Sequence, residues 1–390
     1  MSSSGGGKAE LAWLSAVLWA GHGLGPSNGR YAILPSAARP RLLVPLGSRR
    51  AGATALTAHT SSRRVSRLFA RVLAAGFHAG VSGHLLRSRA GPAQSDRSAE
   101  LLENHIQEVM GQQLYMAVFF QTGRPQKKPV LQLITPGGAL VGYAKVGWND
   151  VTRRLVRREG EALEQVARAL PRDAPFGVPP VRYRGTWRGH ELLITDAVGG
   201  VGRGLLADPP IDATATLAQL SVEQQEALPA SRYWCRQRAR IEATTSDSAR
   251  ALGGAVEESV GSGRLKLGFV HGDWVPWNMA RCRDGRLLVW DWEWSIDSAP
   301  VGLDALQWLF QVELNLRHRR PGAAVDHTAR AALELLARLG IPAALVQPLL
   351  AMHVIESILR LEEARSGGVG AVISTQRYDI AAERLLERMA

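Results

Sequence analysis

Three oxygen-bearing side chains follow two apolar runs in the second half of the chain. The first run leads into His271-Gly-Asp273, and Asn278 stands five positions after that aspartate. The second run ends at Asp291, thirteen positions after Asn278. Asn and Asp side chains offer the hard oxygen ligands that suit Mg²⁺, and a carboxylate in a loop can act as a general base. A base combined with Mg²⁺ ligands is the set that phosphoryl transfer to a hydroxyl requires.

Phosphoryl transfer also needs a cation at the phosphates of the nucleotide. The sequence holds 42 arginines but only five lysines, so a lysine on a predicted strand is an unusual residue here. Lys145 is such a residue. The predicted helix that follows carries three acidic candidates, Glu159, Glu161 and Glu164, for the carboxylate that would orient it.

The motif His271-Gly-Asp-x-x-x-x-Asn278, followed by Val-Trp-Asp291-Trp-Glu, resembles the aminoglycoside phosphotransferase and choline kinase superfamily, whose members are relatives of protein kinases. The resemblance covers roughly residues 101–390. It implies an enzyme that uses Mg-ATP to phosphorylate a hydroxyl group of a small molecule. In that scheme Asp273 is the catalytic base, His271 orients the catalytic loop, and Asn278 and Asp291 bind Mg²⁺.

The resemblance assigns further residues outside this motif. Asp304 matches a buried aspartate that braces the catalytic loop by hydrogen bonds. Lys145 would reach the α and β phosphates of the nucleotide. Glu159 is favoured as its orienting carboxylate because apolar Leu163 follows four positions later, which leaves the two other glutamates in solvent.

The nucleotide base is expected to hydrogen-bond main-chain groups around Thr195 and Ala197, with GTP as an alternative to ATP. One departure from the family pattern lies in residues 121–128, the turn that would cover the phosphates. It holds a single glycine and no Gly-x-Gly-x-x-Gly. Its basic residues, Lys127 and Lys128 among them, either contact phosphate in place of the missing backbone cradle or are simply solvated.

The predicted fold class is α+β, a bilobal protein-kinase-like fold with an N-terminal extension. A small antiparallel-sheet N-lobe would bind the nucleotide, and a larger, mostly helical C-lobe would hold the catalytic residues and the acceptor. The hydrophobic patterns place helices at residues 101–110 and 151–170, and strands at 114–121, 129–135, 139–146, 181–187 and 191–195. The domains are then 1–97 for the extension, 98–200 for the N-lobe and 201–390 for the C-lobe.

The extension carries its own patterns. Residues 1–8 are rich in Ser and Gly, which predicts disorder, and residues 31–45 favour a hairpin. Residues 62–86 predict an amphipathic helix with arginines opposite its apolar face. That helix either packs on the main body or contacts nucleic acid or a membrane. Residues 87–97 are typical of a linker.

The net charge of +12 belongs to the first half of the chain. Residues 1–197 hold 26 Lys and Arg against 12 Asp and Glu, whereas residues 198–390 hold 21 against 23. The basic residues lack interleaved aromatics and any recognition motif, so we expect no nucleic-acid partner. The apolar stretch 11–24 is too short to span a bilayer and lacks a cleavage site, so we expect no membrane partner and a cytoplasmic protein. The spacing of the two cysteines indicates neither a disulfide framework nor a metal site.

The acceptor is the open part of this hypothesis. Trp274 and Trp277 flank the proposed base, and they could equally stack on an acceptor or pack in the core. A polycationic aminoglycoside would favour a more acidic C-lobe than this one, so a neutral sugar or an amino alcohol is an equal candidate. The alternative to an enzyme is a pseudokinase, an interaction module that retains the fold. The sequence does not indicate an oligomeric state.

Overall fold

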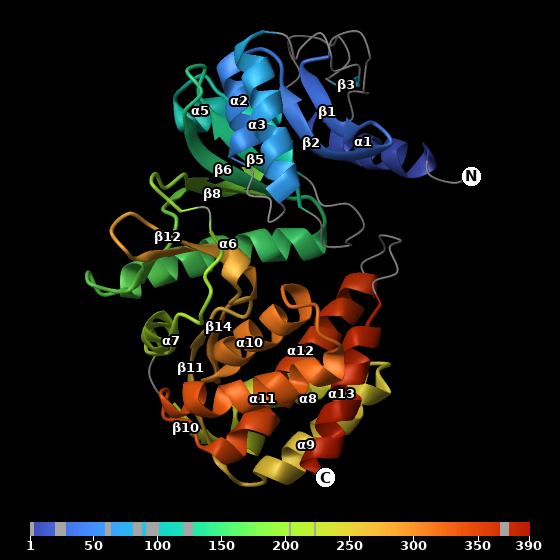
Figure 1. Cartoon of the computed structure of the whole chain (residues 1–390), viewed down its shortest axis with the longest axis vertical. Helices are drawn as coiled ribbons and strands as arrows, with labels where there is room; N and C mark the ends of the chain where they lie inside the picture. Colours follow the sequence, from blue (N-terminus) through green and yellow to red (C-terminus); the bar gives the residue numbers. More distant parts are fainter. Residues whose placement is uncertain are drawn as a thin grey trace. The chain divides into compact units, whose positions relative to one another are not determined.

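The computed structural model describes residues 4–19, 29–58, 64–80, 88–90, 101–119, 128–202, 204–221, 224–366 and 374–390. Over these residues the chain divides into two compact units, each described by itself below (Figure 1). Unit 1 comprises Met1–Arg157 and Pro180–Gly199, and unit 2 comprises Arg158–Pro179 and Gly200–Ala390. The extension is therefore part of unit 1.

Unit 1 is built on an antiparallel sheet in the order β3-β1-β2-β4-β5-β6-β9-β8. Its strands are β1 (Tyr31–Ser36), β2 (Arg39–Pro45), β3 (Arg89–Ala90), β4 (Tyr115–Phe119), β5 (Val130–Ile134), β6 (Leu140–Gly147), β8 (Val181–Trp187) and β9 (His190–Asp196). The five strands predicted for the N-lobe are all present as β4, β5, β6, β8 and β9. Their buried Val, Ile and Leu residues suit a pleated surface with a covered face.

The extension continues this sheet through β2. Leu42 and Leu43 of β2 pair with Phe119 and Val118 of β4, so the predicted hairpin β1–β2 forms the next strands of the same sheet. Where disorder was expected for residues 1–8, helix α1 (Ser4–Leu18) begins at Ser4. It forms because the apolar side chains that follow pack against the sheet.

Helices cover both faces of the enlarged sheet. Successive residues of a strand point to opposite faces. Leu43 belongs to a cluster that includes α1 and α5 (Leu102–Met110), whereas its neighbours Leu42 and Val44 belong to a cluster with α2 (Arg49–Thr57) and α3 (Arg64–His78). The amphipathic helix predicted for residues 62–86 is α3, and it packs against α2 (Figure 1). The predicted helix at 101–110 is α5.

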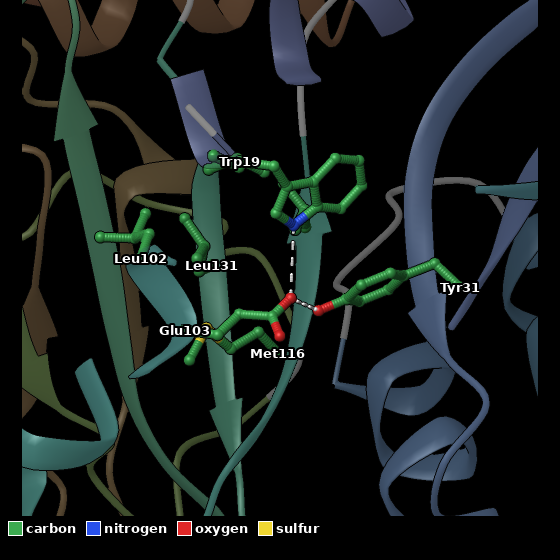
Figure 2. Close-up of a pocket in the computed structure, with 8 residues that line it drawn as sticks. Trp19, Tyr31, Leu102, Glu103, Met116 and Leu131 are labelled. Atoms are coloured by element: carbon green, nitrogen blue, oxygen red, sulfur yellow. Dashed lines mark hydrogen bonds between the residues drawn. The ribbon is translucent and has the colours of Figure 1, made fainter. Parts of the chain in front are cut away.

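One acidic side chain links the extension to helix α5 of unit 1. Glu103 of α5 accepts hydrogen bonds from the Tyr31 hydroxyl and from the Trp19 indole N–H, the latter at 3.4 Å, and lies 3.8 Å from the Arg30 guanidinium (Figure 2). Apolar residues, Leu131 among them, line the surrounding pocket. Burial and the Glu103 carboxylate hold the pKa of Tyr31 well above its usual range, so the phenol stays a donor. The side chains that line this pocket come from both the extension and the later strands of unit 1 (Figure 2).

Helix α6 (Asp150–Ala169) is the helix predicted at 151–170. It begins in unit 1 and continues into unit 2. The Asn149 side chain accepts from the Thr152 N–H at 2.8 Å, a cap that satisfies one of the first free N–H groups of the helix.

Unit 2 is mostly helical, as predicted for the C-lobe. Its helices are α7 (Ile211–Ala218), α8 (Arg232–Ala243), α9 (Asp247–Val260), α10 (Leu303–Asn315), α11 (Pro321–Ala337), α12 (Val346–Ser366) and α13 (Gln376–Met389). One apolar cluster contains buried side chains from every helix between α8 and α13, and from the strands β11 (Arg264–Val270) and β14 (Ile296–Pro300). The stretch Ala343–Arg365 is long and apolar enough to cross a membrane, but it supplies much of this cluster and its most apolar window is 61% buried within the unit. It is the central helix of the core.

Two three-stranded sheets complete unit 2 and position its polar residues. One has the order β10-β11-β14, with β10 at Gln224–Ala227, and the other has the order β12-β13-β7. The second is formed by β12 (Met279–Arg281), β13 (Leu287–Val289) and β7 (Phe176–Gly177). The apolar runs identified in the sequence are thus β11 and β13.

Candidate active site

The segment after β11 forms a tight loop that carries Asp273. Gly272 adopts a φ of +75°, and a Cβ at this position would collide with the Trp294 carbonyl oxygen. Only glycine combines that dihedral angle with so close an approach of the backbone. The loop then enters the short 3₁₀ turn Pro276–Asn278.

Asp304, near the start of α10, holds this loop as expected. Its Oδ2 accepts from the His271 N–H at 2.8 Å and its Oδ1 accepts from the Gly272 N–H at 2.9 Å. The side chain is buried, and burial raises its pKa to about 7 against the opposing effect of these two hydrogen bonds. The predicted brace is confirmed by both hydrogen bonds.

His271 is buried and links the loop to the second strand. Its Nδ1 accepts from the Asp273 N–H at 3.0 Å, so its Nε2 must carry the proton that faces the Trp290 carbonyl oxygen at 3.1 Å. The neutral imidazole ring therefore bridges the backbone of Trp290, which precedes Asp291, and the backbone of Asp273. The two ring hydrogen bonds described above are to backbone groups, and the ring also packs against Trp292 at 4.4 Å, so His271 helps to hold the loop in place.

The two predicted Mg²⁺ ligands lie at matching ends of β12 and β13. Met279 pairs with Val289, and the Trp290 N–H donates to the Asn278 carbonyl oxygen at 3.0 Å. Asp291 then adopts a left-handed conformation with φ +66°, which is uncommon outside glycine. Strand pairing thus brings Asn278 next to the residue before Asp291.

Asn278 also touches the predicted base directly. Its Nδ2 donates to Asp273 Oδ2 at 2.6 Å and to the Asp273 carbonyl oxygen at 3.0 Å. Because the amide nitrogen is committed to these acceptors, the amide oxygen is the atom left to bind a cation. The structure therefore brings His271, Asp273 and Asn278 together, with Asp291 adjoining them through β13.

The donor set fits Mg²⁺ better than a transition metal. No group of three or more His, Cys, Asp or Glu side chains able to hold a metal occurs in the described part of the chain. Mg²⁺ is usually held by one or two protein oxygens together with phosphates and waters, rather than by a full protein cage. Asn278 and Asp291 could supply those oxygens.

Two residues that the sequence analysis did not single out complete the loop's contacts. Gln307 of α10 contacts both Asp273 and Trp274. Arg360 of α12 donates to the Gly272 carbonyl oxygen at 2.7 Å and stacks over the Trp294 ring at 4.4 Å. Gln307 lies three positions after Asp304 on the same helix, but it is one of several polar residues there, so the sequence held no specific signal for it. Arg360 lies 88 positions from its loop partner.

Arg360 is itself held in place by an ion pair. Its Nε lies 2.6 Å from Glu356, which also pairs with Arg240 of α8 at 2.5 Å. Burial alone would raise the pKa of Glu356, but the two guanidinium groups lower it to about 2. Glu356 therefore stays ionised and anchors Arg360 against the catalytic loop.

The tryptophans beside the base have different environments. Trp274 is fully buried, edge-on to Phe176 at 6.0 Å and to His271 at 5.6 Å. Trp277 is 38% exposed. The sequence left core packing and contact with an acceptor as equal predictions for both tryptophans. Trp274 packs in the core, whereas Trp277 is the one accessible from outside the unit.

The predicted nucleotide-binding residues are distributed over both units. Lys145 lies on β6 in unit 1, in register with Val130 on one side and Leu193 on the other. Thr195 and Ala197 lie at the end of β9, where the Ala197 N–H already donates to the Val141 carbonyl oxygen at 3.0 Å. That N–H is therefore already paired within the sheet.

Glu159 lies on α6, in the part of the helix that belongs to unit 2. It is only 2% exposed and Leu163 is also buried, as predicted. Glu161 is exposed as expected, whereas Glu164 is half-buried and not fully in solvent. Of the basic turn expected to cover the phosphates, residues 121–127 lie outside the described residues.

No protein-family model matches the sequence, and no curated protein matches it. Solved structures to which the chain is similar include an aminoglycoside phosphotransferase, APH(4)-Ia, in its apo form, with 12% identity and a TM-score of 0.48 over 74% of this chain and 99% of that one. A choline kinase, LicA from Streptococcus pneumoniae, has 15% identity and a TM-score of 0.43 over 66% of this chain and 89% of that one. A macrolide 2′-phosphotransferase, MphH from Brachybacterium faecium, has 16% identity and a TM-score of 0.44 over 71% and 96%. These proteins are of the superfamily that the sequence motifs resemble.

Proposed function

We propose that the chain is an ATP-dependent phosphotransferase that phosphorylates a hydroxyl group of a small molecule, with Asp273 as the base. The observation that carries this proposal is the convergence of Asp273, Asn278 and Asp291. The first two are in direct contact at 2.6 Å, and the backbone of Asn278 pairs with Trp290, the residue before Asp291. A base beside two oxygen ligands for Mg²⁺ is the arrangement that phosphoryl transfer needs.

The proposed mechanism gives each of these residues a separate task. Asp273 accepts the proton of the acceptor hydroxyl as its oxygen attacks the γ-phosphate. Asn278 and Asp291 would hold Mg²⁺, which when bound with ATP neutralises charge on the phosphates. His271 and Asp304 keep the loop in shape through backbone hydrogen bonds.

The remaining nucleotide contacts are part of the same proposal. Lys145 would bind the α and β phosphates, with Glu159 as its orienting carboxylate. Main-chain groups around Thr195 and Ala197 would hydrogen-bond the adenine. ATP is proposed as the donor, and a GTP sample beside it tests that choice.

The proposed acceptor is a hydroxylated small molecule that reaches Asp273 beside the exposed ring of Trp277. An aromatic ring suits stacking on a sugar or a cation–π contact with an amine. The cytoplasm, where ATP is abundant, is the proposed location.

The test is release of ADP from Mg-ATP in the presence of varied hydroxylated acceptors, measured by an enzyme-coupled assay. Asp273→Asn should lower turnover by about 10²- to 10⁴-fold, because a general base contributes that much. Asp284→Asn is the matched control. Asp284 lies in the exposed turn between β12 and β13 and bonds only to Arg286 among the contacts described for it, so turnover should be unchanged.

Two results would contradict the proposal. The first is turnover by Asp273→Asn within about twofold of the wild type, which would exclude Asp273 as the base. The second is a wild-type protein that neither releases ADP nor gains thermal stability with Mg-ATP. Ligand at 100 times its dissociation constant should add about 2.7 kcal/mol, so the absence of any gain would favour a pseudokinase.

A further inference from the structure

Gln307 makes two hydrogen bonds to the loop that carries the proposed base. It lies on α10 one turn after Asp304 and is only 6% exposed. Its Oε1 accepts from the Trp274 N–H at 3.1 Å, and its Nε2 donates to Asp273 Oδ1 at 3.2 Å. The side-chain amide of Gln307 thus contacts the backbone of Trp274 and the side chain of Asp273, which are adjacent in the loop.

The orientation of this amide is fixed by its surroundings. The Trp274 backbone N–H can only donate, so it must face the amide oxygen. The NH₂ group then has to point at the Asp273 carboxylate, which can only accept. A flipped amide would place donor against donor and acceptor against acceptor, so the assignment of Gln307 Oε1 and Nε2 follows from chemistry.

Together with Asn278, this contact holds both oxygens of Asp273. Asn278 Nδ2 binds Oδ2 at 2.6 Å from the 3₁₀ turn, and Gln307 Nε2 binds Oδ1 at 3.2 Å from α10. Rotation about the last torsion of an aspartate is otherwise broad. Two neutral amides on separate elements restrict this rotation without adding charge.

We infer that Gln307 is a positioning residue that sets the orientation of the Asp273 carboxylate toward the acceptor hydroxyl. The inference rests on the proposed function, since it assigns Asp273 as the base. Gln307 touches neither substrate nor metal in this scheme, and its effect on rate passes through Asp273 alone. It differs from Asp304, which binds only backbone N–H groups of the same loop.

The next turn of α10 provides a matched control. Gln311 is 8% exposed and makes two side-chain hydrogen bonds, donating to the Tyr378 hydroxyl at 3.1 Å and accepting from Asn315 at 2.7 Å. Neither of these partners belongs to the catalytic loop. Gln307→Leu and Gln311→Leu therefore remove similar numbers of buried hydrogen bonds from one helix, but only the first affects Asp273.

The kinetic arm measures ADP release from Mg-ATP, first with water as the acceptor and then with an acceptor found by the screen. Gln307→Leu should lower kcat by about 10- to 100-fold with little change in KM for ATP, because a misplaced reacting group costs rate rather than nucleotide binding. Gln311→Leu should change kcat by less than about twofold. If Gln307→Leu does not fold, Gln307→Asn replaces it, since an amide one methylene shorter cannot reach both partners.

A double variant separates positioning from general damage. In an Asp273→Asn background, Gln307→Leu should cause no further loss of rate, because the group on which Gln307 acts is already removed. A further loss of tenfold or more would show that Gln307 acts by another route and would overturn the inference. Equal loss of kcat in Gln307→Leu and Gln311→Leu would overturn it as well.

An exchange measurement distinguishes failure of this inference from failure of the proposed function. Gln307→Leu should speed hydrogen exchange in the peptide that contains Trp274, since that N–H loses its acceptor, whereas Gln311→Leu should not. Unchanged exchange would show that Gln307 does not hold the loop. Faster exchange in a protein whose wild type has no turnover would show that Gln307 holds the loop but that the proposed phosphotransferase function is wrong.

Discussion

Acid should weaken unit 2 through one buried histidine, His353 of α12. The ring is 7% exposed and packs edge-on against Phe310 at 5.8 Å, and its Nε2 has no hydrogen-bond partner among the described residues. Burial lowers its pKa from 6.5 to about 3, Arg360 adds to that decrease, and Glu356 opposes it. The folded protein therefore keeps this histidine neutral at pH values where the unfolded chain protonates it.

The direction and size of the effect follow from that difference in pKa. Above pH 6.5 the histidine is neutral in both states and its contribution is fully present. As pH falls toward 3 only the unfolded state gains the proton, so the free energy of unfolding decreases. At pH 5, which is 1.5 units below the ordinary pKa, the loss is about 2 kcal/mol at 1.36 kcal/mol per unit.

Urea unfolding at several pH values between 7 and 5 measures this loss, with tryptophan fluorescence as the signal. His353→Leu removes the titration, so the stability gap between wild type and variant should change by about 2 kcal/mol across that range in favour of the variant. His318→Asn is the control, because His318 is exposed and asparagine tolerates its φ of +53°. A gap that stays constant from pH 7 to pH 5 would refute the role of His353 burial.

Two further substitutions test the loop brace and the attachment of the extension. Asp304→Asn should destabilise the protein by about 1–3 kcal/mol, because one of the two loop N–H groups would face an amide NH₂. Urea unfolding measures this loss of stability. A variant as stable as the wild type would contradict the role of Asp304 in holding the loop. Glu103→Leu should cost a similar amount by leaving the buried Tyr31 hydroxyl and the Trp19 N–H without their acceptor. Limited proteolysis should then release the extension sooner, while an unchanged cleavage rate would contradict its attachment through Glu103.

The loop and its brace could be predicted from the sequence because their signals are local. Apolar strands directly precede Asp273 and Asp291, and the family pattern then assigned Asp304. All three lie where expected in unit 2. The burial of Glu159 was predictable for a related reason, since helical spacing places it on the same face as Leu163.

The residues that were missed make contacts distant in sequence. Gln307 and Arg360 reach the loop from α10 and α12, and nothing in their own neighbourhoods specifies which loop they face. Trp274 and Trp277 lie three positions apart, yet Trp274 is buried against Phe176 and His271 whereas Trp277 is 38% exposed. Such outcomes depend on tertiary structure, which a single sequence specifies only indirectly.

The pairing of β2 with β4 has a consequence for the edge of the sheet in unit 1. Without the extension, β4 would be an outer strand whose backbone N–H and C=O groups are open to pairing with another molecule. The apolar side chains now covered by α1, α2 and α3 would also be uncovered. A chain that begins at about residue 101 would therefore expose this strand edge to pairing with another molecule, which the extension covers in the full chain.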